Sequence, residues 1–197
     1  MRRADCLAVL SEAYDEQALV VTPTGASYRY WEALGRAGQI SHINLGLCFP
    51  LGLGLALALP NRRILVLDGD GSLLFNLSSL VDLGRYSPPN LVGIVFDNEG
   101  YESCDSISSA TASTTDLQTV ARGCGISHVS TLHDLDEFGT AVEEAATAEV
   151  LTMLIAKIEL EERPFEETPS SDGKENKYRF VRHVEELEGN RIFRPFG

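Results

Sequence analysis

The 197-residue chain has few cysteines and few basic residues, and each shortage excludes a class of function. Its four cysteines are scattered, and no two of them form a Cys-x-x-Cys pair. A zinc or iron–sulfur site is therefore not expected, and the thiols fit a reducing cytoplasm. Only 16 Lys and Arg residues oppose 29 Asp and Glu residues, which gives a formal charge of -13. Such a chain should repel nucleic acids and anionic membranes, so neither is an expected partner.

A long uninterrupted apolar segment is also missing. The first residues include two arginines and several acids, which is typical of a surface helix rather than a signal peptide. The most apolar stretch, residues 45–59, is interrupted by glycines and a proline and is too short to span a bilayer. With 44% hydrophobic and 23% charged residues, the composition predicts a soluble, cytoplasmic globular protein.

What the sequence does contain is a regular alternation of apolar strands and amphipathic helices. Strands are expected at 18–21, 63–67, 91–96, 128–130 and 150–158, with helices at 28–35, 50–59, 73–84, 116–123 and 135–148. Strands such as ILVL and LVGIVF are apolar throughout, which is typical of a sheet covered on both faces. The pattern predicts an α/β fold with a doubly wound parallel sheet and helices on both faces.

The composition changes after Ile158. We therefore divide the chain into an α/β domain at 1–158 and a polar linker with an amphipathic C-terminal tail at 159–197. The acidic residues at 159–167 are expected to be solvated. The tail has one apolar helix face, formed by Tyr178, Phe180, Val181 and Val184. This face can dock on its own domain or on another subunit.

The strongest functional signal follows the apolar strand at 63–67. There the residues Asp-Gly-Asp-Gly-Ser at 68–72 open a helix. The small residues let a ligand approach the backbone, and the free N–H groups at the start of a helix favour phosphate. Asp70 can supply a hard oxygen ligand to a divalent cation.

A second polar loop follows the next apolar strand, where Asp-Asn-Glu-Gly-Tyr occupies residues 97–101. Adjacent parallel strands end at the same edge of a sheet, where α/β folds bind ligands. Asp70 and Asn98, 28 residues apart, can therefore meet at one metal ion. Each motif alone is often only a turn, but the pair at strand–helix–strand spacing is much more specific.

Together the two motifs resemble the signature of the thiamine diphosphate enzymes, a Gly-Asp-Gly followed at this distance by Asn. The resemblance implies that Asp70, Asn98 and the Gly100 carbonyl hold Mg²⁺ on the cofactor's diphosphate. It also implies that Ser72 and the Gly71 N–H face the diphosphate. The cofactor-binding residues implied by this motif are Gly69, Asp70, Gly71, Ser72, Asn98, Gly100 and Tyr101.

Two further segments resemble the same family. The segment Thr24, Gly25, Ala26, Ser27 matches a loop near the diphosphate, with Ala26 where a hydroxyl is common. Leu45 matches the bulky residue that wedges the cofactor into its V shape, and the Ile43 carbonyl would accept a hydrogen bond from the cofactor's 4′-amino group. Without the neighbouring motifs, ordinary core packing would be the better interpretation of Leu45.

The resemblance covers residues 18–158 and is strongest to the small diphosphate-binding subunit of sulfopyruvate and phosphonopyruvate decarboxylases. It implies a carbon–carbon lyase that decarboxylates a 2-oxo acid. Arg179-Phe180 in the tail also matches. The loop after Tyr101 departs from the pattern of these relatives, and its residues Ser103 and Cys104 are expected to line the substrate pocket.

Enzymes of this family divide the cofactor between two domains, and the second domain supplies a Glu that activates the aminopyrimidine. A chain of 197 residues accommodates one such domain. The resemblance therefore implies a β-type subunit that is completed by a separate pyrimidine-binding α-type subunit in an α₂β₂ or larger hetero-oligomer. An apolar surface around Leu45, Leu47 and Phe49 would be buried by that partner.

Histidines are few, and one lies near the expected site. His42 is placed to face the substrate as a proton donor, although a lone histidine at a strand end is more often structural. The other three, at positions 128, 133 and 183, are interpreted as surface or core residues.

Three other functions stay open. A subunit of a 2-oxoacid oxidoreductase is usually longer and often carries clustered cysteines, unlike this chain. The diphosphate-binding half of a split transketolase normally has more sequence before its Gly-Asp-Gly. The last is a non-catalytic regulatory or scaffold subunit that only binds the cofactor, and the intact Asp70, Asn98 and Leu45 argue against a complete loss of function.

Overall fold

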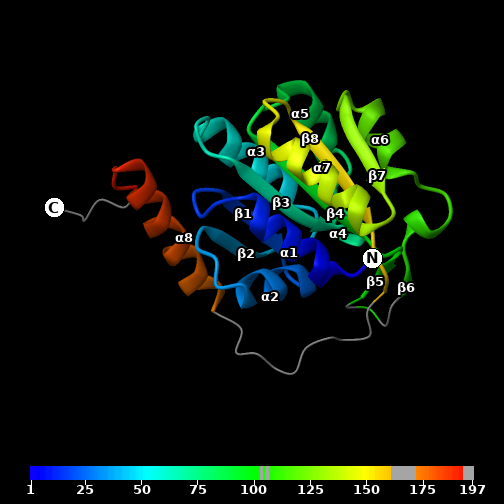
Figure 1. Cartoon of the computed structure of the whole chain (residues 1–197), viewed down its shortest axis with the longest axis horizontal. Helices are drawn as coiled ribbons and strands as arrows, with labels where there is room; N and C mark the ends of the chain where they lie inside the picture. Colours follow the sequence, from blue (N-terminus) through cyan, green and yellow to red (C-terminus); the bar gives the residue numbers. More distant parts are fainter. Residues whose placement is uncertain (103, 105–106, 161–171, 193–197) are drawn as a thin grey trace.

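The computed structural model describes residues 1–102, 104, 107–160 and 172–192. Six parallel strands form one sheet in the order β2-β1-β3-β4-β8-β7 (Figure 1). The strands are β1 (Leu19–Pro23), β2 (Gln39–Ile43), β3 (Ile64–Gly69), β4 (Leu91–Asp97), β7 (His128–Leu132) and β8 (Thr152–Lys157). A short antiparallel pair, β5 (Gly100–Tyr101) and β6 (Ile107–Ser108), lies after β4.

Helices cover both faces of the sheet, which confirms the predicted fold class. They are α1 (Arg3–Ala13), α2 (Ala26–Ala33), α3 (Cys48–Ala58), α4 (Asp70–Leu74), α5 (Ser79–Tyr86), α6 (Leu117–Gly123), α7 (Leu135–Thr147) and α8 (Gly173–Glu188), with a 3₁₀ turn η1 at Ala110–Ala112. Within the described ranges, no helix is long and apolar enough to cross a membrane.

The sheet has a separate hydrophobic core on each face. Helices α1, α2 and α7 pack on one face through residues such as Trp31 and Phe138. Helices α3, α5, α6 and α8 pack on the other, with Phe49 among its buried residues. Successive strand residues point alternately into the two cores, so Leu65 lies in one and Val66 in the other. This two-sided burial explains why the central strands are apolar throughout.

Three sequence-based expectations need correction. Strand β2 was not among the expected strands, because its sequence QISHI is short and half polar, as suits a sheet edge. The helix expected at 73–84 is two helices, since the chain turns at 75–78 and Asn76 bonds the Gly46 carbonyl there. Helix α1 is not merely a surface helix, because Leu7 and Leu10 are buried on the sheet.

Helix α8 docks on the sheet of its own chain, along edge strand β2. The Asn176 amide donates to the Gln39 carbonyl at 3.2 Å and accepts from the Ser41 N–H at 2.8 Å, as a neighbouring strand would. Phe180 and Val184 are buried as expected, but Tyr178 is exposed, so its assignment to the apolar face was wrong. Most of the predicted linker, residues 161–171, lies outside the described residues. The division at residue 158 stays a prediction.

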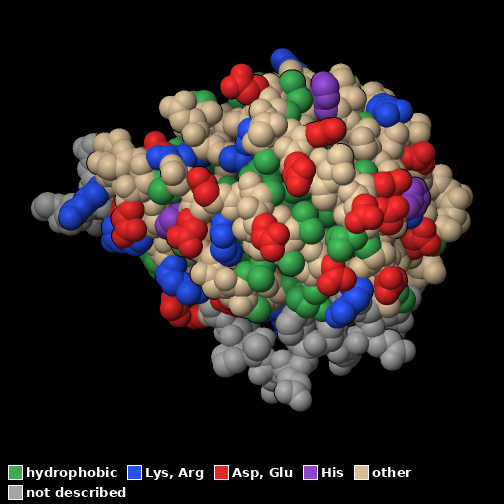
Figure 2. Space-filling model, in the orientation of Figure 1, with side chains coloured by type: hydrophobic (Ala, Val, Ile, Leu, Met, Phe, Trp, Pro, Cys, Tyr) green, Lys and Arg blue, Asp and Glu red, His purple; other side chains and the backbone are tan. Residues whose placement is uncertain are grey.

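The surface charge is spread rather than concentrated on the face seen in Figure 2. Acidic side chains are scattered over that face, with basic ones between them. The net charge of -13 is therefore not gathered into one patch of this face.

Candidate functional site

The four segments singled out in the sequence follow four neighbouring strands. Residues 24–27 follow β1, 43–46 lie at the end of β2, 69–72 at the end of β3 and 98–101 follow β4. All four strands are parallel and adjacent in the sheet, so these segments meet at one edge (Figure 1). From β1 the chain moves one way to β2, and it then crosses back to β3 on the other side. This edge therefore includes the switch point where α/β folds bind ligands.

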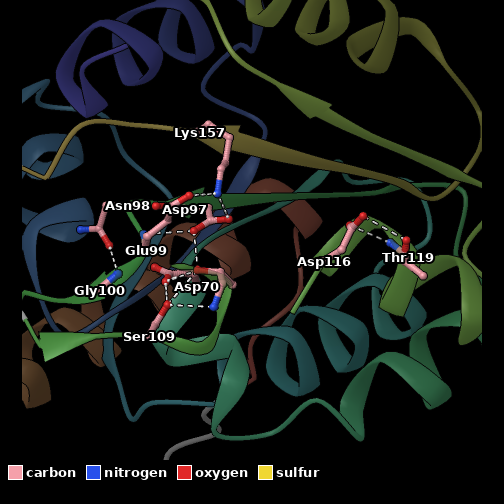
Figure 3. Close-up of polar contacts among 10 residues, drawn as sticks. Asp70, Asp97, Asn98, Glu99, Gly100, Ser109, Asp116, Thr119 and Lys157 are labelled. Atoms are coloured by element: carbon pink, nitrogen blue, oxygen red, sulfur yellow. Dashed lines mark hydrogen bonds and ion pairs between the residues drawn. The ribbon is translucent and has the colours of Figure 1, made fainter. Parts of the chain in front are cut away.

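Asp70 is the buried centre of this edge, with only 1% of its surface exposed. Its Oδ2 accepts a hydrogen bond from the Ser109 hydroxyl at 2.6 Å (Figure 3). The same oxygen lies 3.1 Å from the Thr111 hydroxyl. Burial raises the pKa of Asp70 and the charge of Asp97 adds to the effect, while the bond from Ser109 opposes it. A desolvated carboxylate with incomplete compensation suits a divalent cation, so this position fits the expected Mg²⁺.

Asn98 lies in the loop after β4 and is 8% exposed. Its Oδ1 accepts the Gly100 N–H at 3.1 Å, and its Nδ2 donates to Glu102 Oε1 at 2.6 Å. An amide oxygen has two lone pairs, so Oδ1 retains one for a cation. Glu99, between Asn98 and Gly100, has a φ of 62°, a left-handed conformation that is uncommon for a residue with a side chain. Backbone of this kind is concentrated at functional sites.

A network that the sequence did not predict connects Asp70 to this loop. The Thr111 hydroxyl lies 2.8 Å from Asp97 Oδ1 and 3.1 Å from Asp70 Oδ2. Lys157, the last residue of β8, donates to Asp97 Oδ2 at 2.9 Å and to Glu99 Oε1 at 2.6 Å. The network therefore contacts both residues that flank Asn98.

The charge of Lys157 is maintained by its two acidic partners. Burial alone would lower the pKa of Lys157, but the hydrogen bonds and charges of Glu99 and Asp97 together raise it. One sequence signal could have located this residue, since Lys157 ends an apolar strand at the same edge as Asp70. Ser109 and Thr111 carried no such signal, because they lie in a run of Ser, Thr and Ala residues.

Gly71 is required by a close approach of Tyr101. A Cβ at position 71 would lie 2.6 Å from Cδ1 of the Tyr101 ring, which is too short for any real contact. The same ring meets Phe75 edge-on, with centroids 6.1 Å apart. Tyr101 therefore packs directly on the backbone of the Gly-Asp-Gly segment.

Hydrogen bonds connect the segment Leu45-Gly46 to Ser72 of α4 and to Asn76 in the turn after α4. The Gly46 N–H donates to Ser72 Oγ at 3.2 Å, and the Gly46 carbonyl accepts from Asn76 Nδ2 at 3.0 Å. Leu45 is 41% exposed, so core packing is the wrong interpretation of this residue. It is held at the ligand-binding edge with much of its side chain uncovered.

Part of the expected apolar surface is corrected. Leu47 is exposed as anticipated, but Phe49 is buried at 1% exposure. Its ring fills the space above Gly93, where a Cβ would lie 2.5 Å from Phe49 Cε1. The exposed apolar side chains of Phe75 and Ile107, close to Tyr101, take its place at this edge.

The Ile43 carbonyl is already paired. It accepts hydrogen bonds from the Thr24 N–H at 3.1 Å and from the Thr24 hydroxyl at 3.3 Å. A ligand amino group would have to displace the hydroxyl to bond this carbonyl. Gly25 has a φ of 136°, which only glycine adopts readily, and it leads into Ala26 and the buried Ser27 at the start of α2.

His42 occupies a bulge at the end of β2. Val21 of β1 pairs with Ile40 but Pro23 pairs with Ile43, so β2 contains one extra residue, and His42 has a φ of 62°. Its Nδ1 lies 2.8 Å from Ser41 Oγ, and its ring lies 4.4 Å from that of Tyr28.

The other histidines lie away from this edge or on the surface, in agreement with the sequence interpretation. His128 and His133 are exposed, and His183 is partly exposed on α8, 3.3 Å from the Glu16 carbonyl. Of the two residues expected to line the substrate pocket, Cys104 is exposed, and Ser103 lies outside the described residues.

Asp68, the first residue of the 68–72 motif, is a fully buried carboxyl directly behind the site, and no role was predicted for it from the sequence. Burial raises its pKa to about 6, although hydrogen bonds from Ser72 and the Gly69 N–H oppose the change. Its last-but-one position in an apolar strand was the available signal.

Among the described residues, no group of three or more His, Cys, Asp or Glu side chains could hold a metal. The expected ligand set differs, since it combines one carboxylate with an amide and a backbone carbonyl.

Comparison with known proteins adds independent findings. Residues 24–156 match a family model described as "Thiamine pyrophosphate enzyme, C-terminal TPP binding domain", where thiamine pyrophosphate is another name for thiamine diphosphate. The matched region begins at Thr24 and ends within β8, so it includes all four ligand-edge segments.

Two curated relatives and a solved structure are similar to the chain. The sulfopyruvate decarboxylase subunit beta of Methanocaldococcus jannaschii is 32% identical over 158 residues, covering 79% of this chain and 83% of the relative. The phosphonopyruvate decarboxylase of Streptomyces viridochromogenes is 35% identical over 139 residues, covering 70% of this chain and 34% of the relative. The benzoylformate decarboxylase structure from Polynucleobacter necessarius aligns with a TM-score of 0.67 at 19% identity, covering 84% of this chain and 34% of that one. The last likeness concerns the fold alone, and the chain spans about a third of these two longer proteins.

Proposed function

The chain belongs to the thiamine pyrophosphate enzymes, and we propose that it is the diphosphate-binding, β-type subunit of a thiamine diphosphate-dependent 2-oxo acid decarboxylase. The observation that carries this proposal is the meeting of Asp70 with the Asn98–Gly100 loop at the carboxyl ends of β3 and β4. The buried carboxylate of Asp70 and the spare lone pair on Asn98 Oδ1 are the type of ligands that Mg²⁺ prefers.

In this proposal Asp70, Asn98 Oδ1 and the Gly100 carbonyl would hold a cation, whose charge would compensate that of the diphosphate. A cation is needed because the chain itself carries a formal charge of -13 and would repel an anionic cofactor. The backbone N–H groups of residues 25–27 at the start of α2 would donate to the diphosphate from the neighbouring strand. The diphosphate would lie against four residues of the two motifs, Gly69, Gly71, Ser72 and Tyr101.

Leu45 would orient the cofactor in this arrangement. It is exposed at the edge, while Gly46 fixes its backbone through Ser72 and Asn76. A partly uncovered side chain on a fixed backbone can press against a ligand without first becoming ordered. The cofactor, when bound, supplies the electron sink that a 2-oxo acid decarboxylation requires.

His42 would act as a proton donor near the substrate. The Ser41 hydroxyl occupies its Nδ1, which leaves Nε2 for exchange with a substrate or water. Cys104 and Ser103 would line the pocket on the other side of the site. The unusual backbone of His42 supports a specific role, because a strained residue persists only where the surrounding structure imposes it.

A separate subunit would complete the site. The M. jannaschii relative is named as a subunit beta, and its length is close to that of this chain. About two thirds of the length of the longer phosphonopyruvate decarboxylase lies outside the matched region. The exposed apolar side chains of Leu45, Leu47, Phe75 and Ile107 would lie against the partner, which would grip the aminopyrimidine and supply the activating Glu.

The proposal is tested by reconstitution. The chain is purified alone and together with the product of an adjacent reading frame that encodes a pyrimidine-binding domain. Release of CO₂ is then followed across a panel of 2-oxo acids with thiamine diphosphate and Mg²⁺. We expect turnover from the complex only, and none when it contains the Asp70→Ala variant.

Other results would redirect or contradict the proposal. Equal turnover by the isolated chain would refute the shared site. Reduction of an electron acceptor together with CO₂ release would indicate an oxidoreductase, and transfer of a two-carbon unit between sugars would indicate a transketolase. A complex that binds the cofactor without any turnover would indicate a scaffold subunit.

A further inference from the structure

Arg3, the first residue of α1, has a buried guanidinium with little pairing. Arg3 is 4% exposed, and its Nη2 donates to Glu102 Oε1 at 2.7 Å. Its Nε and Nη1 are buried and have no hydrogen-bond partner among the described residues. Burying unpaired hydrogen-bond donors destabilises a protein. The buried Nε and Nη1 of Arg3 therefore lower the stability of the fold, and the guanidinium makes few contacts that offset the loss. Besides the ion pair with Glu102, the guanidinium lies 6.0 Å from the centroid of Phe96 in β4.

The start of the chain is fixed beside the ligand-binding edge. The Met1 carbonyl accepts the Glu159 N–H at 3.0 Å, and the Met1 ammonium lies 3.5 Å from Glu159 Oε1. Glu159 follows β8, and Figure 1 places the N-terminus next to β5. Arg3 therefore approaches Glu102 from an anchored backbone rather than from a free end.

Glu102 connects Arg3 to Asn98. Its Oε1 accepts both the Arg3 guanidinium and Asn98 Nδ2, the latter at 2.6 Å. An ionised carboxylate can only accept hydrogen bonds, so it selects the amide orientation in which nitrogen faces Glu102 and oxygen faces away. The Gly100 N–H bond to Asn98 Oδ1 is consistent with the same orientation.

We propose that Arg3 and Glu102 are positioning residues that fix the Asn98 amide so that Oδ1, and not Nδ2, is presented to the cation. This inference rests on the proposed function for its cation. A flipped amide would present two N–H donors to a positive ion and remove one ligand. Loss of a partner that orients a metal ligand typically weakens metal binding by about 10- to 100-fold. The N-terminal helix thereby contributes to cofactor binding without touching the cofactor.

The first test measures metal affinity with Mn²⁺ as the probe. The full chain in its assembled complex is titrated with Mn²⁺ in the presence of thiamine diphosphate, and free Mn²⁺ is followed by electron paramagnetic resonance. Arg3→Met and Glu102→Leu should each weaken Mn²⁺ binding by about 10-fold or more. Arg2→Met, a change at the exposed neighbouring arginine, is the matched control and should leave binding unchanged.

Conservative variants separate positioning from a general loss of structure. Arg3→Lys should restore most of the affinity, because only one guanidinium nitrogen is hydrogen-bonded. Glu102→Gln should also retain much of it, since its amide oxygen can accept from Asn98. Wild-type affinity in both Arg3→Met and Glu102→Leu would overturn the proposal, as would equal losses in Arg3→Met and Arg2→Met.

A second measurement needs no cofactor. The side-chain amide signals of Asn98 are followed by NMR in the full chain, labelled with ¹⁵N, without metal or cofactor. Both Arg3→Met and Glu102→Leu should shift these signals while signals of α6, which packs on the other face of the sheet, stay in place, and unshifted Asn98 signals would overturn the inference. A wild-type complex that takes up no Mn²⁺ with the cofactor would instead refute the proposed function.

Discussion

Gly46→Ala should destabilise the protein more than Gly35→Ala, although both glycines have a left-handed backbone. Their φ angles are 79° and 67°, so an alanine at either position costs about 1–2 kcal/mol in backbone strain. The two surroundings differ. A Cβ on Gly46 would lie 2.8 Å from Asn76 Cβ and 3.2 Å from Phe75 Cβ, whereas a Cβ on Gly35 meets nothing within 4 Å. Overpacking of this kind adds about 1–3 kcal/mol at position 46.

Urea unfolding of the two variants and the wild type measures this difference directly. Extrapolation to water should give a loss of about 1–2 kcal/mol for Gly35→Ala and about 2–5 kcal/mol for Gly46→Ala. The larger loss should be accompanied by weaker cofactor binding, because Gly46 carries the backbone of Leu45 and its N–H donates to Ser72. Equal losses in the two variants would refute the close packing of Gly46 on the turn that follows α4.

Two further predictions concern the wedge residue and the buried carboxyl behind the site. Leu45→Ala should lower kcat in the assembled enzyme with only a modest change in cofactor affinity, since it removes orientation rather than a diphosphate contact; Leu57→Ala, at an exposed leucine of α3, is the control, and full kcat in Leu45→Ala would exclude the wedge role. Because burial raises the pKa of Asp68 from 3.8 to about 6, the folded chain binds a proton more tightly than the unfolded chain, and stability should fall as the pH rises from about 4 to about 6. Asp68→Asn should remove this dependence and gain up to about 3 kcal/mol at pH 7 but little at pH 4 in urea unfolding; parallel pH profiles for variant and wild type would contradict the assignment.

The parts of the site that the sequence predicted are those encoded locally. Asp70 and Asn98 each follow an uninterrupted apolar strand, and two parallel strands joined by a helix bring their carboxyl ends to one edge. The central strands were predictable for the same reason, since burial on both faces requires continuous apolar residues. Edge strand β2 was missed because one side of it is free of the sheet, and Asn176 of α8 rather than a strand pairs with it.

The contacts that orient these ligands were not predictable, because their partners are far apart in the sequence. Arg3 and Glu102 are 99 residues apart, and Lys157 lies 60 residues beyond Asp97. Nothing in the local pattern of α1 distinguishes Arg3 from the exposed Arg2 before it. The exposure of Leu45 and the burial of Phe49 were not predictable either. The two apolar residues lie in one short segment, yet Leu45 faces solvent and Phe49 lies in the core.

Calorimetry of thiamine diphosphate binding in the presence and absence of Mg²⁺ tests the central claim most directly. It compares the wild-type complex with Asp70→Ala and Asn98→Ala, and Asp116→Ala serves as a control. Asp116 is also a carboxylate that accepts hydrogen bonds, but it caps α6 through Thr119, away from Asp70 (Figure 3). We expect Mg²⁺-dependent binding in the wild type and the control, and a large loss of that dependence in both site variants. Unchanged affinity and Mg²⁺ dependence in Asp70→Ala and Asn98→Ala would contradict the assignment of the site.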